Sequence, residues 1–410
     1  MQIDLAACNI KKWVDLGDSF ASGIGAGQRG PNSGDTVCSR YTEAYGNVMN
    51  VVLDGQGPDT REFTWVACSG AKTDYVVGKE VPSIDPDVDI ATLTIGGNDV
   101  GFFDILNACV FQFNHYTPCS DQITTTTNLI NNDLPPKLDN LLSAIMSQVA
   151  NSGFKLYMTG YAHFFNVETT QCNNVSFNFW EEKPENQANL TTELRGNLNN
   201  LVQILNGQIS SAVDRANGRD PRKPCVFVDI SPSFNTHRYC DIGIDEPDLN
   251  NDMRWFQENW LFEQHTPYSG NNISNQYQTW AAQQVQSDPS YRVSNQFVSE
   301  LSIQSQIDIY GWGQWVFDAL ARAFHPTADG HNGIKDVILS AYTATPPSSN
   351  CDGCKALQPA TALVPAPSMK RDVPAGAEAP KVTGTPKVKR ITLQGVAAPE
   401  ITHMPKAFRA

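Results

Sequence analysis

The segment WVDLGDSFASGIGAGQRG, residues 13–30, contains two motifs that imply different folds and functions. Residues 25–30 have the G-x-G-x-x-G pattern of dinucleotide-binding loops. Upstream, the apolar run at 13–16 predicts a short buried strand, and the tripeptide Gly-Asp-Ser at 17–19 follows it directly. The interpretation of the chain depends on which of the two motifs carries the chemistry.

The glycine pattern lacks the context that dinucleotide binding requires. Its glycines should form the turn directly after a strand, with a helix beginning at that turn. The predicted strand ends well before Gly25, and the sequence PNSG at 31–34 is typical of a loop. Ser19, in contrast, lies just past a strand, where open α/β sheets place their functional residues. We therefore favour a functional serine over a nucleotide-binding loop.

Predicted strands alternate with predicted helices along the chain. The helical spacing of apolar residues is clear at 138–149 and 194–213. This alternation indicates an α/β fold, with a parallel sheet and right-handed crossover connections. Five short runs are apolar enough to be strands buried on both faces, at residues 13–16, 63–67, 90–95, 155–159 and 226–230.

Composition divides the chain into a folded part, residues 1–344, and a tail, residues 345–410. The tail is rich in Pro and Ala without periodicity, which predicts disorder. Within the folded part, residues 241–310 are rich in Asn, Gln and Ser and are predicted to be an insertion. The insertion contains the aromatic residues Trp255, Phe256, Trp260, Phe262 and Trp280. The aromatic cluster from Trp255 to Phe262 is either a lid over the substrate or the insertion's own small core, and we favour the core.

The charge distribution argues against two classes of partner. The formal net charge is −14, and the tail carries 9 basic and 4 acidic side chains. The folded part therefore carries 20 basic and 39 acidic side chains, a net charge of −19. Such an acidic body repels nucleic acids and anionic membranes. No run of about 18 apolar residues is present, so no membrane-spanning helix is expected.

Cysteine usage and glycosylation motifs predict a secreted protein. The ten cysteines are scattered along the chain, which fits disulfides better than a metal site. Cys351 and Cys354 form a single C-x-x-C without matching histidines, so no zinc is expected there. Sequons begin at Asn174, Asn189 and Asn272. The first residues lack the pattern of a signal peptide, so either the leader is absent from this sequence or the prediction of secretion is wrong.

Four segments carry side chains that acyl transfer requires. Ser19 follows the first strand, and ACSGAKT (67–73) and TIGGNDVGF (94–102) follow the second and third. FHPTADGH (324–331) lies near the end of the folded part. Loops after parallel strands meet at one edge of the sheet, so a nucleophile, a base and oxyanion donors can converge there. Ser19 alone would be interpreted as a helix cap, but together the four segments favour catalysis.

These segments resemble the four blocks of the SGNH hydrolases, also called the GDSL esterase/lipase family. Ser19, Gly70, Asn98 and His325 match the blocks in order. The resemblance covers roughly residues 12–342 and, with HRYCD at 237–241, is greatest for the secreted actinobacterial and fungal branch. It implies a three-layer, flavodoxin-like α/β fold and ester hydrolysis through an acyl-enzyme, without a metal or cofactor.

The resemblance also implies a role for each matched residue. Ser19 is the expected nucleophile and His325 the expected general base. The backbone N–H groups of Ser19 and Gly70 and the side-chain amide of Asn98 would form the oxyanion hole. Glycine at position 70, and at 96 and 97, is expected to permit backbone geometry and close approach that a Cβ would obstruct. His331 is an alternative base, but its position in a predicted helix favours a surface or packing role.

The group that orients His325 departs from the common family pattern. Many members have an aspartate three residues before the histidine, and this chain has Arg322 there. The branch that the chain resembles uses a backbone carbonyl at this position, so we predict a Ser19–His325 dyad supported by the carbonyl of Arg322. Asp318, one helical turn upstream, is the rival candidate.

Replacing Asp318 by asparagine separates the two hypotheses. If the carbonyl of Arg322 orients the imidazole, Asp318→Asn is expected to retain most esterase activity. If Asp318 acts as the acid of a triad, kcat should fall by about ten-thousand-fold. The measurement is kcat for a short-chain p-nitrophenyl ester, and a loss of that size would refute the dyad.

The resemblance implies three disulfides, Cys38–Cys68, Cys109–Cys119 and Cys172–Cys240, and leaves Cys8, Cys225, Cys351 and Cys354 unassigned. We predict a secreted serine esterase or lipase acting on a small-molecule, lipid or acylated-glycan ester. The alternative is a catalytically silent protein of the same fold that binds glycans or lipids. The sequence does not select the acyl group, the alcohol or the oligomeric state.

Overall fold

The computed structural model describes residues 10–30, 32–54, 61–112, 117–177, 188–222, 224–244, 246, 253–257 and 323–344. The chain divides into two units, Met1–Gln358 and Pro359–Ala410, and every described residue belongs to the first. Most of the predicted insertion and the whole predicted tail lie outside the described residues, so these two predictions remain predictions.

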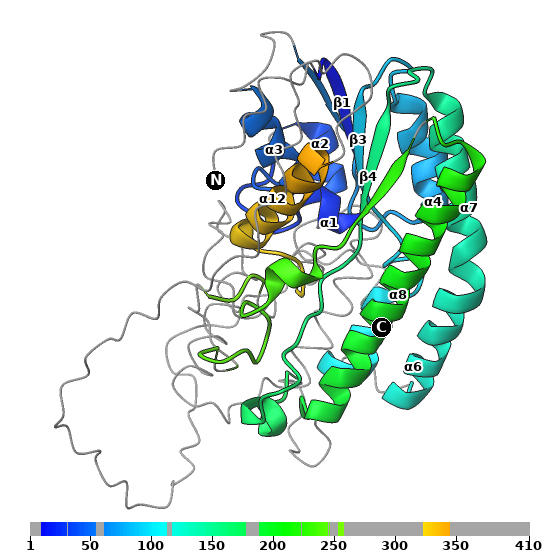
Figure 1. Ribbon diagram of the computed structural model, residues 1–410. Helices are drawn as coiled ribbons and strands as arrows, with labels where there is room; N and C mark the ends of the chain where they lie inside the picture. The colour runs from blue at the N-terminus through cyan, green and yellow to red at the C-terminus, as the bar shows by residue number, and fades with distance from the viewer. Residues whose placement is uncertain are drawn as a thin grey trace, which may run out of the picture. The chain divides into compact units, whose positions relative to one another are not determined.

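A five-stranded, fully parallel sheet forms the centre of the fold (Figure 1). Its strand order is β2-β1-β3-β4-β5, the order of flavodoxin-like folds. The predicted α/β class is therefore confirmed, and each predicted strand is present with its ends shifted by at most two residues. The strands are β1 (Lys12–Gly17), β2 (Glu62–Trp65), β3 (Ile90–Thr94), β4 (Lys155–Thr159) and β5 (Cys225–Val228).

Helices cover both faces of the sheet and produce three layers. In Figure 1, α3 and α12 lie on one face, and α4, α7 and α8 lie on the other. The α-helices are α1 (Ser19–Ser22), α2 (Ser33–Cys38), α3 (Tyr45–Asp54), α4 (Thr73–Tyr75), α5 (Phe102–Leu106), α6 (Cys119–Asn128), α7 (Leu134–Gln148), α8 (Thr192–Arg219) and α12 (Ala328–Ala344). Short 3-10 and π segments are η1 (Val76–Glu80), η2 (Val81–Ser83), η3 (Asn107–Phe111), η4 (Leu129–Asp133), η5 (Gln171–Asn174) and η7 (Ser231–Phe234).

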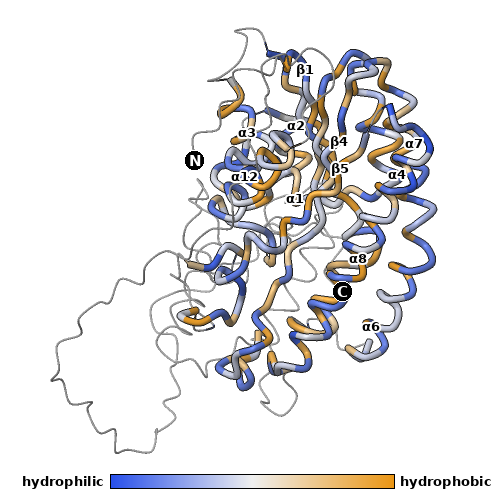
Figure 2. The backbone as a smooth tube through the Cα atoms, in the orientation of Figure 1, coloured by the Kyte–Doolittle hydropathy of each residue, from blue (hydrophilic) through white to orange (hydrophobic). Residues whose placement is uncertain are grey.

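The apolar pattern of each element explains its place in these layers. All five residues of β3 are buried, as expected for a central strand that is covered on both faces. Along α8, the predicted stripe of Leu198, Leu201, Leu205 and Ile209 faces the core. Figure 2 shows both patterns. The strands are mostly apolar, while the helices alternate between hydrophilic and hydrophobic positions.

The junction between β1 and β3 sets the position of the candidate site. These strands are neighbours although β2 lies between them in sequence, and open α/β sheets place their ligand sites at the carboxyl ends of such a pair. Gly17 closes β1 at φ +127°, and a Cβ there would lie 2.1 Å from the carbonyl oxygen of Thr94 in β3. Only glycine allows this approach. Asp18 then donates its backbone N–H to the same oxygen at 2.9 Å.

The structure contains the three disulfides implied by the family resemblance, Cys38–Cys68, Cys109–Cys119 and Cys172–Cys240. The first joins α2 to the loop after β2, which carries Gly70. Cys225 in β5 is a buried free thiol, and burial raises its pKa to about 12. Cys8, Cys351 and Cys354 lie outside the described residues.

Candidate active site

Ser19 is the first residue of α1, immediately after β1. The Asp18 carboxylate caps this helix by accepting the backbone N–H of Phe20 at 3.0 Å. Because Asp18 provides the cap, the Ser19 hydroxyl is available for another partner. Ser19 is buried, with 8% of the residue's surface exposed.

His325 reaches Ser19 from the far end of the chain. Its Nε2 lies 2.6 Å from Ser19 Oγ, although 306 residues separate the two. On the other side of the ring, Nδ1 lies 3.2 Å from the backbone carbonyl oxygen of Ala323. This geometry suits an imidazole that donates from Nδ1 and accepts the serine proton at Nε2. The predicted orienting residues, Arg322 and Asp318, lie outside the described residues, and their roles stay predictions.

A short strap, defined here as residues 254–257, holds the backbone around His325. Phe256 forms an isolated antiparallel bridge with Pro326. The N–H of Gln257 donates to the His325 carbonyl at 2.7 Å, and the N–H of Thr327 donates to the carbonyl of Trp255 at 2.8 Å. These contacts fix the peptide units on both sides of the imidazole. Sequence analysis did not identify Gln257, because nothing distinguishes it within a segment rich in Asn and Gln.

The described aromatic residues of the predicted insertion differ from the expectation. Phe256 packs against Phe164, with ring centroids 5.4 Å apart, and Trp255 stacks on His237 at 4.0 Å. Both therefore pack on the main domain, so the prediction that they form the insertion's own core is wrong. The physical reason is the strap, whose backbone pairing carries their side chains onto the core. Trp260, Phe262 and Trp280 lie outside the described residues.

The loop that carries Gly70 and the loop that carries Asn98 are joined by a hydrogen bond. The Asn98 amide, in the loop after β3, donates from Nδ2 to the carbonyl oxygen of Ala71 at 3.0 Å. Ala71 adjoins Gly70, which has φ +81°. A Cβ on Gly70 would meet no atom within 4 Å, so the predicted close approach at this position is wrong. Glycine is favoured there by its left-handed backbone conformation instead.

Comparisons with known proteins identify two bacterial lipases as relatives of this chain. No protein-family model matches the chain. It is 35% identical over 158 residues to Lipase 1 of Streptomyces coelicolor, which covers 38% of this chain and 55% of that protein. It is 34% identical over 155 residues to a lipase of Streptomyces rimosus, covering 38% and 54%. The chain thus spans about half the length of the curated relatives that it matches.

Two solved structures share the fold over most of the chain. Phospholipase A1 from Streptomyces albidoflavus NA297 superimposes with a TM-score of 0.52 and 22% identity, covering 81% of this chain and 99% of that one. An extracellular lipase from Streptomyces rimosus gives a TM-score of 0.52 and 20% identity over the same shares. These matches show that the chain has the fold of these two enzymes, and the lipase relatives support its resemblance to the SGNH hydrolases.

Tyr161 connects the loop that carries Ser19 to the loop that carries Asn98. Its hydroxyl donates to Asp18 Oδ2 and accepts the backbone N–H of Gly97 at 2.9 Å. Asp18 precedes Ser19 and Gly97 precedes Asn98, so one phenol links the Ser19 loop to the Asn98 loop. A Cβ on Gly97 would lie only 3.2 Å from this hydroxyl, as expected for a close approach. Sequence analysis missed Tyr161, which lies two residues beyond β4.

Three buried carboxyl groups, those of Asp15, Asp18 and Glu80, lie in β1 or next to it. Burial raises the pKa of Asp18 to about 7, although the hydrogen bond from Tyr161 opposes this shift. Burial also raises the pKa of Asp15 to about 8 and that of Glu80 to about 9. Glu80 accepts the N–H of Gly17 at 2.8 Å, while Asp15 accepts the hydroxyl of Thr92 at 2.6 Å. At neutral pH, Asp15 and Glu80 are therefore mostly protonated, which limits negative charge near Ser19.

His331 has a packing role. It lies in α12 with no exposed surface, and its Nδ1 accepts the backbone N–H of Tyr45 at 3.2 Å. Burial lowers its pKa to about 3, so the ring stays neutral near pH 7. This environment agrees with the favoured prediction and argues against His331 as the base.

The described part of the chain contains no group of three or more His, Cys, Asp or Glu side chains arranged to hold a metal ion. Within the same residues, no helix combines the length and apolar character needed to cross a bilayer.

Proposed function

We propose that this protein hydrolyses carboxylic esters through an acyl-enzyme formed on Ser19, using a Ser19–His325 dyad. The observation that carries the proposal is the 2.6 Å contact between Ser19 Oγ and His325 Nε2, beside a tyrosine, Tyr161, that binds the residues preceding Ser19 and Asn98. A serine hydroxyl is a weak nucleophile by itself, and a base at hydrogen-bond distance activates it.

Acylation begins when Ser19 Oγ attacks the ester carbonyl carbon and His325 Nε2 accepts the hydroxyl proton. The carbonyl oxygen becomes an oxyanion, which accepts hydrogen bonds from the backbone N–H groups of Ser19 and Gly70 and from the amide of Asn98. The tetrahedral intermediate collapses, the bond to the alcohol oxygen breaks, and Nε2 returns the proton to that oxygen. The alcohol leaves, and the acyl group remains on Ser19.

Deacylation repeats these steps with water. His325 Nε2 accepts a proton from the water as its oxygen attacks the acyl carbon, and the second oxyanion uses the same donors. Collapse breaks the bond to Ser19 Oγ, which regains the proton, and releases the carboxylic acid. A backbone carbonyl at Nδ1 keeps that nitrogen protonated, so Nε2 remains free to accept protons.

The surroundings of the dyad favour ester substrates with apolar groups. The rings of Phe20 and Phe102 lie with centroids 5.1 Å and 5.7 Å from that of His325. Both relatives named above are lipases, and the two solved structures are a phospholipase A1 and a lipase. We therefore propose a lipid-type ester as the substrate class of this chain.

We also propose that the protein works in an oxidising, extracytoplasmic compartment. Its three disulfides would not persist among reduced thiols. The two described sequon asparagines, Asn174 and Asn189, are both exposed, as glycan attachment requires.

Covalent labelling tests the proposed nucleophile. A fluorophosphonate ester is expected to add one phosphonyl group to the protein and to abolish hydrolysis of p-nitrophenyl butyrate in proportion to labelling. Fragment mass spectrometry should place the group on Ser19 and not on Ser22, which lies in the same short helix and provides the internal control. A fully labelled protein that still hydrolyses the ester, or a label on another residue, would refute the proposal.

A further inference from the structure

The side chain of Gln257, the last residue of the strap, lies between the loop that carries His325 and the chain that follows Ser19. Its Nε2 donates to the carbonyl oxygen of Pro326 at 3.2 Å and to that of Ile24 at 3.4 Å. A primary amide has two N–H donors, so one is available for each of these carbonyls. Because Gln257 is buried, little water competes for the bonds. The amide therefore forms a bridge between two segments that are distant in sequence.

One further hydrogen bond leads from each end of this bridge to a residue of the proposed dyad. The N–H of Ile24 donates to the carbonyl oxygen of Ser19 at 3.3 Å. On the other side, the N–H of Gln257 donates to the carbonyl oxygen of His325 at 2.7 Å. The N–H of Phe324 donates in turn to the carbonyl oxygen of Gln257 at 3.4 Å. The backbones of Ser19 and His325 are thus connected through Gln257, independently of the contact between their side chains.

The glycine pattern at residues 25–30 includes one position that this bridge explains. Gly25 has a φ of +83°, and a Cβ there would lie 2.6 Å from Gln257 Nε2. This distance is shorter than van der Waals contact, so only glycine lets the chain after Ser19 lie against the amide. The first glycine of a pattern that resembles a nucleotide-binding loop therefore makes room for Gln257.

The strap holds Gln257 in a fixed position. Arg254 forms a buried ion pair with Glu246, in which Nη1 lies 2.9 Å and 3.0 Å from the two carboxylate oxygens. The Nε of Arg254 donates to the carbonyl oxygen of Phe256 at 3.1 Å, and the Tyr239 hydroxyl donates to the carbonyl oxygen of Gln257. Moving Gln257 would break buried hydrogen bonds, which is costly. Its position can therefore determine the position of the loop that it binds.

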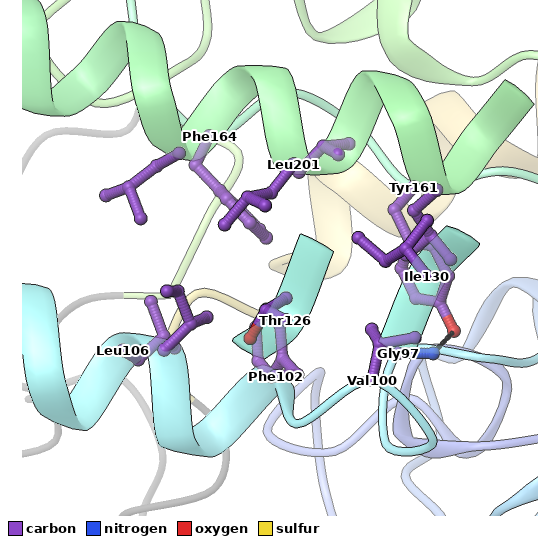
Figure 3. A pocket seen from close by; sticks show the side chains of 13 residues that line it. Gly97, Val100, Phe102, Leu106, Thr126, Ile130, Tyr161, Phe164 and Leu201 are labelled. Atoms are coloured by element: carbon purple, nitrogen blue, oxygen red, sulfur yellow. Dashed lines mark hydrogen bonds between the residues drawn. The ribbon is translucent and has the colours of Figure 1, made fainter. Parts of the chain in front are cut away.

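Tyr161 makes the corresponding connection between the Ser19 loop and the Asn98 loop. Figure 3 shows the Gly97 N–H joined to the Tyr161 hydroxyl by a dashed line, at one end of an apolar pocket. Gln257 connects the Ser19 segment to the loop of the proposed base in the same way, through buried hydrogen bonds. Together the two residues tie three loops of the proposed site to one another.

We propose that Gln257 is a positioning residue, which keeps His325 Nε2 at proton-transfer distance from Ser19 Oγ. The assignment rests on the proposed function, because only a base that serves Ser19 needs this distance to be held. A displacement of about 1 Å between reacting groups can lower a rate by about a hundredfold. Gln257 acts through the backbone of the two residues and not through the substrate, so its loss should lower kcat and leave KM nearly unchanged.

Gln257→Met removes the two N–H donors and keeps a side chain of similar length and volume. We expect kcat for p-nitrophenyl butyrate to fall by about ten- to a hundredfold, with KM nearly unchanged. The control is Gln171→Met, because Gln171 Nε2 also donates to backbone carbonyls, including those of Asp241 and Ile244 at 2.9 Å and 3.0 Å. It should lower the melting temperature but leave kcat unchanged. An unchanged kcat in a folded Gln257→Met protein, or an equal loss in the control, would overturn the proposal.

Two glycine variants test the same bridge from its other side, and they decide the question if Gln257→Met does not fold. Gly25→Ala places a methyl group against Gln257 Nε2 and should lower kcat in the same way. Gly27→Ala is the matched control, because Gly27 has nearly the same φ, +81°, but a Cβ there would meet Glu43 and Thr42 instead. Both variants carry similar backbone strain. A kcat that falls equally in both, or in neither, would refute the role of Gln257.

Nuclear magnetic resonance of the His325 ring gives a readout that does not depend on turnover. The proton on Nδ1, which faces the carbonyl of Ala323, should be visible in protein with isotope-labelled histidine, because His325 is buried. Its resonance, identified by its absence in His325→Ala, should broaden or disappear in Gln257→Met and persist in Gln171→Met. A sharp and unshifted resonance in Gln257→Met would contradict the proposal.

These measurements separate the failure of this proposal from the failure of the proposed function. If hydrolysis depends on Ser19 but kcat does not respond to Gln257→Met, the proposed function stands and only the positioning role fails. If the wild type shows no Ser19-dependent hydrolysis, the proposed function fails, and the resonance alone reports whether Gln257 holds the His325 ring.

Discussion

Replacing Ser19 by alanine is expected to lower kcat for p-nitrophenyl butyrate on the order of a million-fold, as removal of the nucleophile does in serine proteases. The hydroxyl is the atom to which the acyl group transfers, so no neighbouring side chain can substitute for it. A small residual rate over water should persist, because the oxyanion donors remain in place.

The loss should occur without loss of stability. Asp18, not Ser19, caps α1, so the variant should melt within a few degrees of the wild type. Ser22→Ala is a matched control in the same helix, and its kcat should stay close to that of the wild type. Activity that survives Ser19→Ala would exclude Ser19 as the nucleophile.

The histidine provides an independent check on the same mechanism. If Ser19 and His325 act as one unit, His325→Ala should cost nearly as much as Ser19→Ala, and the double variant should cost little more than either alone. Additive losses would mean that the two residues act in separate steps, contrary to their 2.6 Å contact.

The fold could be predicted because each strand is a short apolar run with no competing periodicity. The predicted ends of helices were less accurate where residues near the end, such as proline, affect where the helix begins. The helix predicted from residue 138 begins at Leu134, because Pro135 and Pro136 occupy its first turn. Proline is tolerated there, since the first helical N–H groups have no partner within the helix.

Only those residues of the candidate site that the family motifs and the sheet topology place could be predicted from the sequence. The resemblance selects Ser19, Gly70, Asn98 and His325, and parallel strands explain why the first three lie at one edge of the sheet. The other residues of the site could not be predicted, because their hydrogen-bond partners are distant in sequence. Gln257 and Tyr161 act through hydrogen bonds to residues distant in sequence, and no periodic pattern marks such bonds.

The hydrogen-bond partner of His325 Nδ1 could not be predicted from the sequence either. The resemblance implies the carbonyl of Arg322, while the described structure has the carbonyl of Ala323 at 3.2 Å. Backbone carbonyls are present at every residue, so only the path of the loop determines which one faces the ring. That path depends on Phe324, whose positive φ of +65° turns the chain just before the histidine.

Asn98→Ala is expected to lower kcat by about a hundred- to a thousand-fold, equivalent to about 3 to 4 kcal/mol of transition-state stabilisation, with KM nearly unchanged. The Asn98 amide has two N–H donors, and the hydrogen bond to Ala71 accounts for one of them. That bond orients the amide, and the second N–H is expected to meet the oxyanion, which exists only in the transition state and the intermediate. Interactions made only there affect kcat and not substrate binding.

The size of this loss distinguishes an oxyanion donor from a purely structural residue. Asn217→Ala is a matched control, because its amide also donates to a backbone carbonyl, that of Cys225, but at the far end of α8. It should lower the melting temperature and leave kcat unchanged. Asn98→Asp should be slower than Asn98→Ala, since a carboxylate repels the developing negative charge. If Asn98→Ala instead behaves like the control, the asparagine serves the loop alone, and the oxyanion hole must consist of backbone N–H groups.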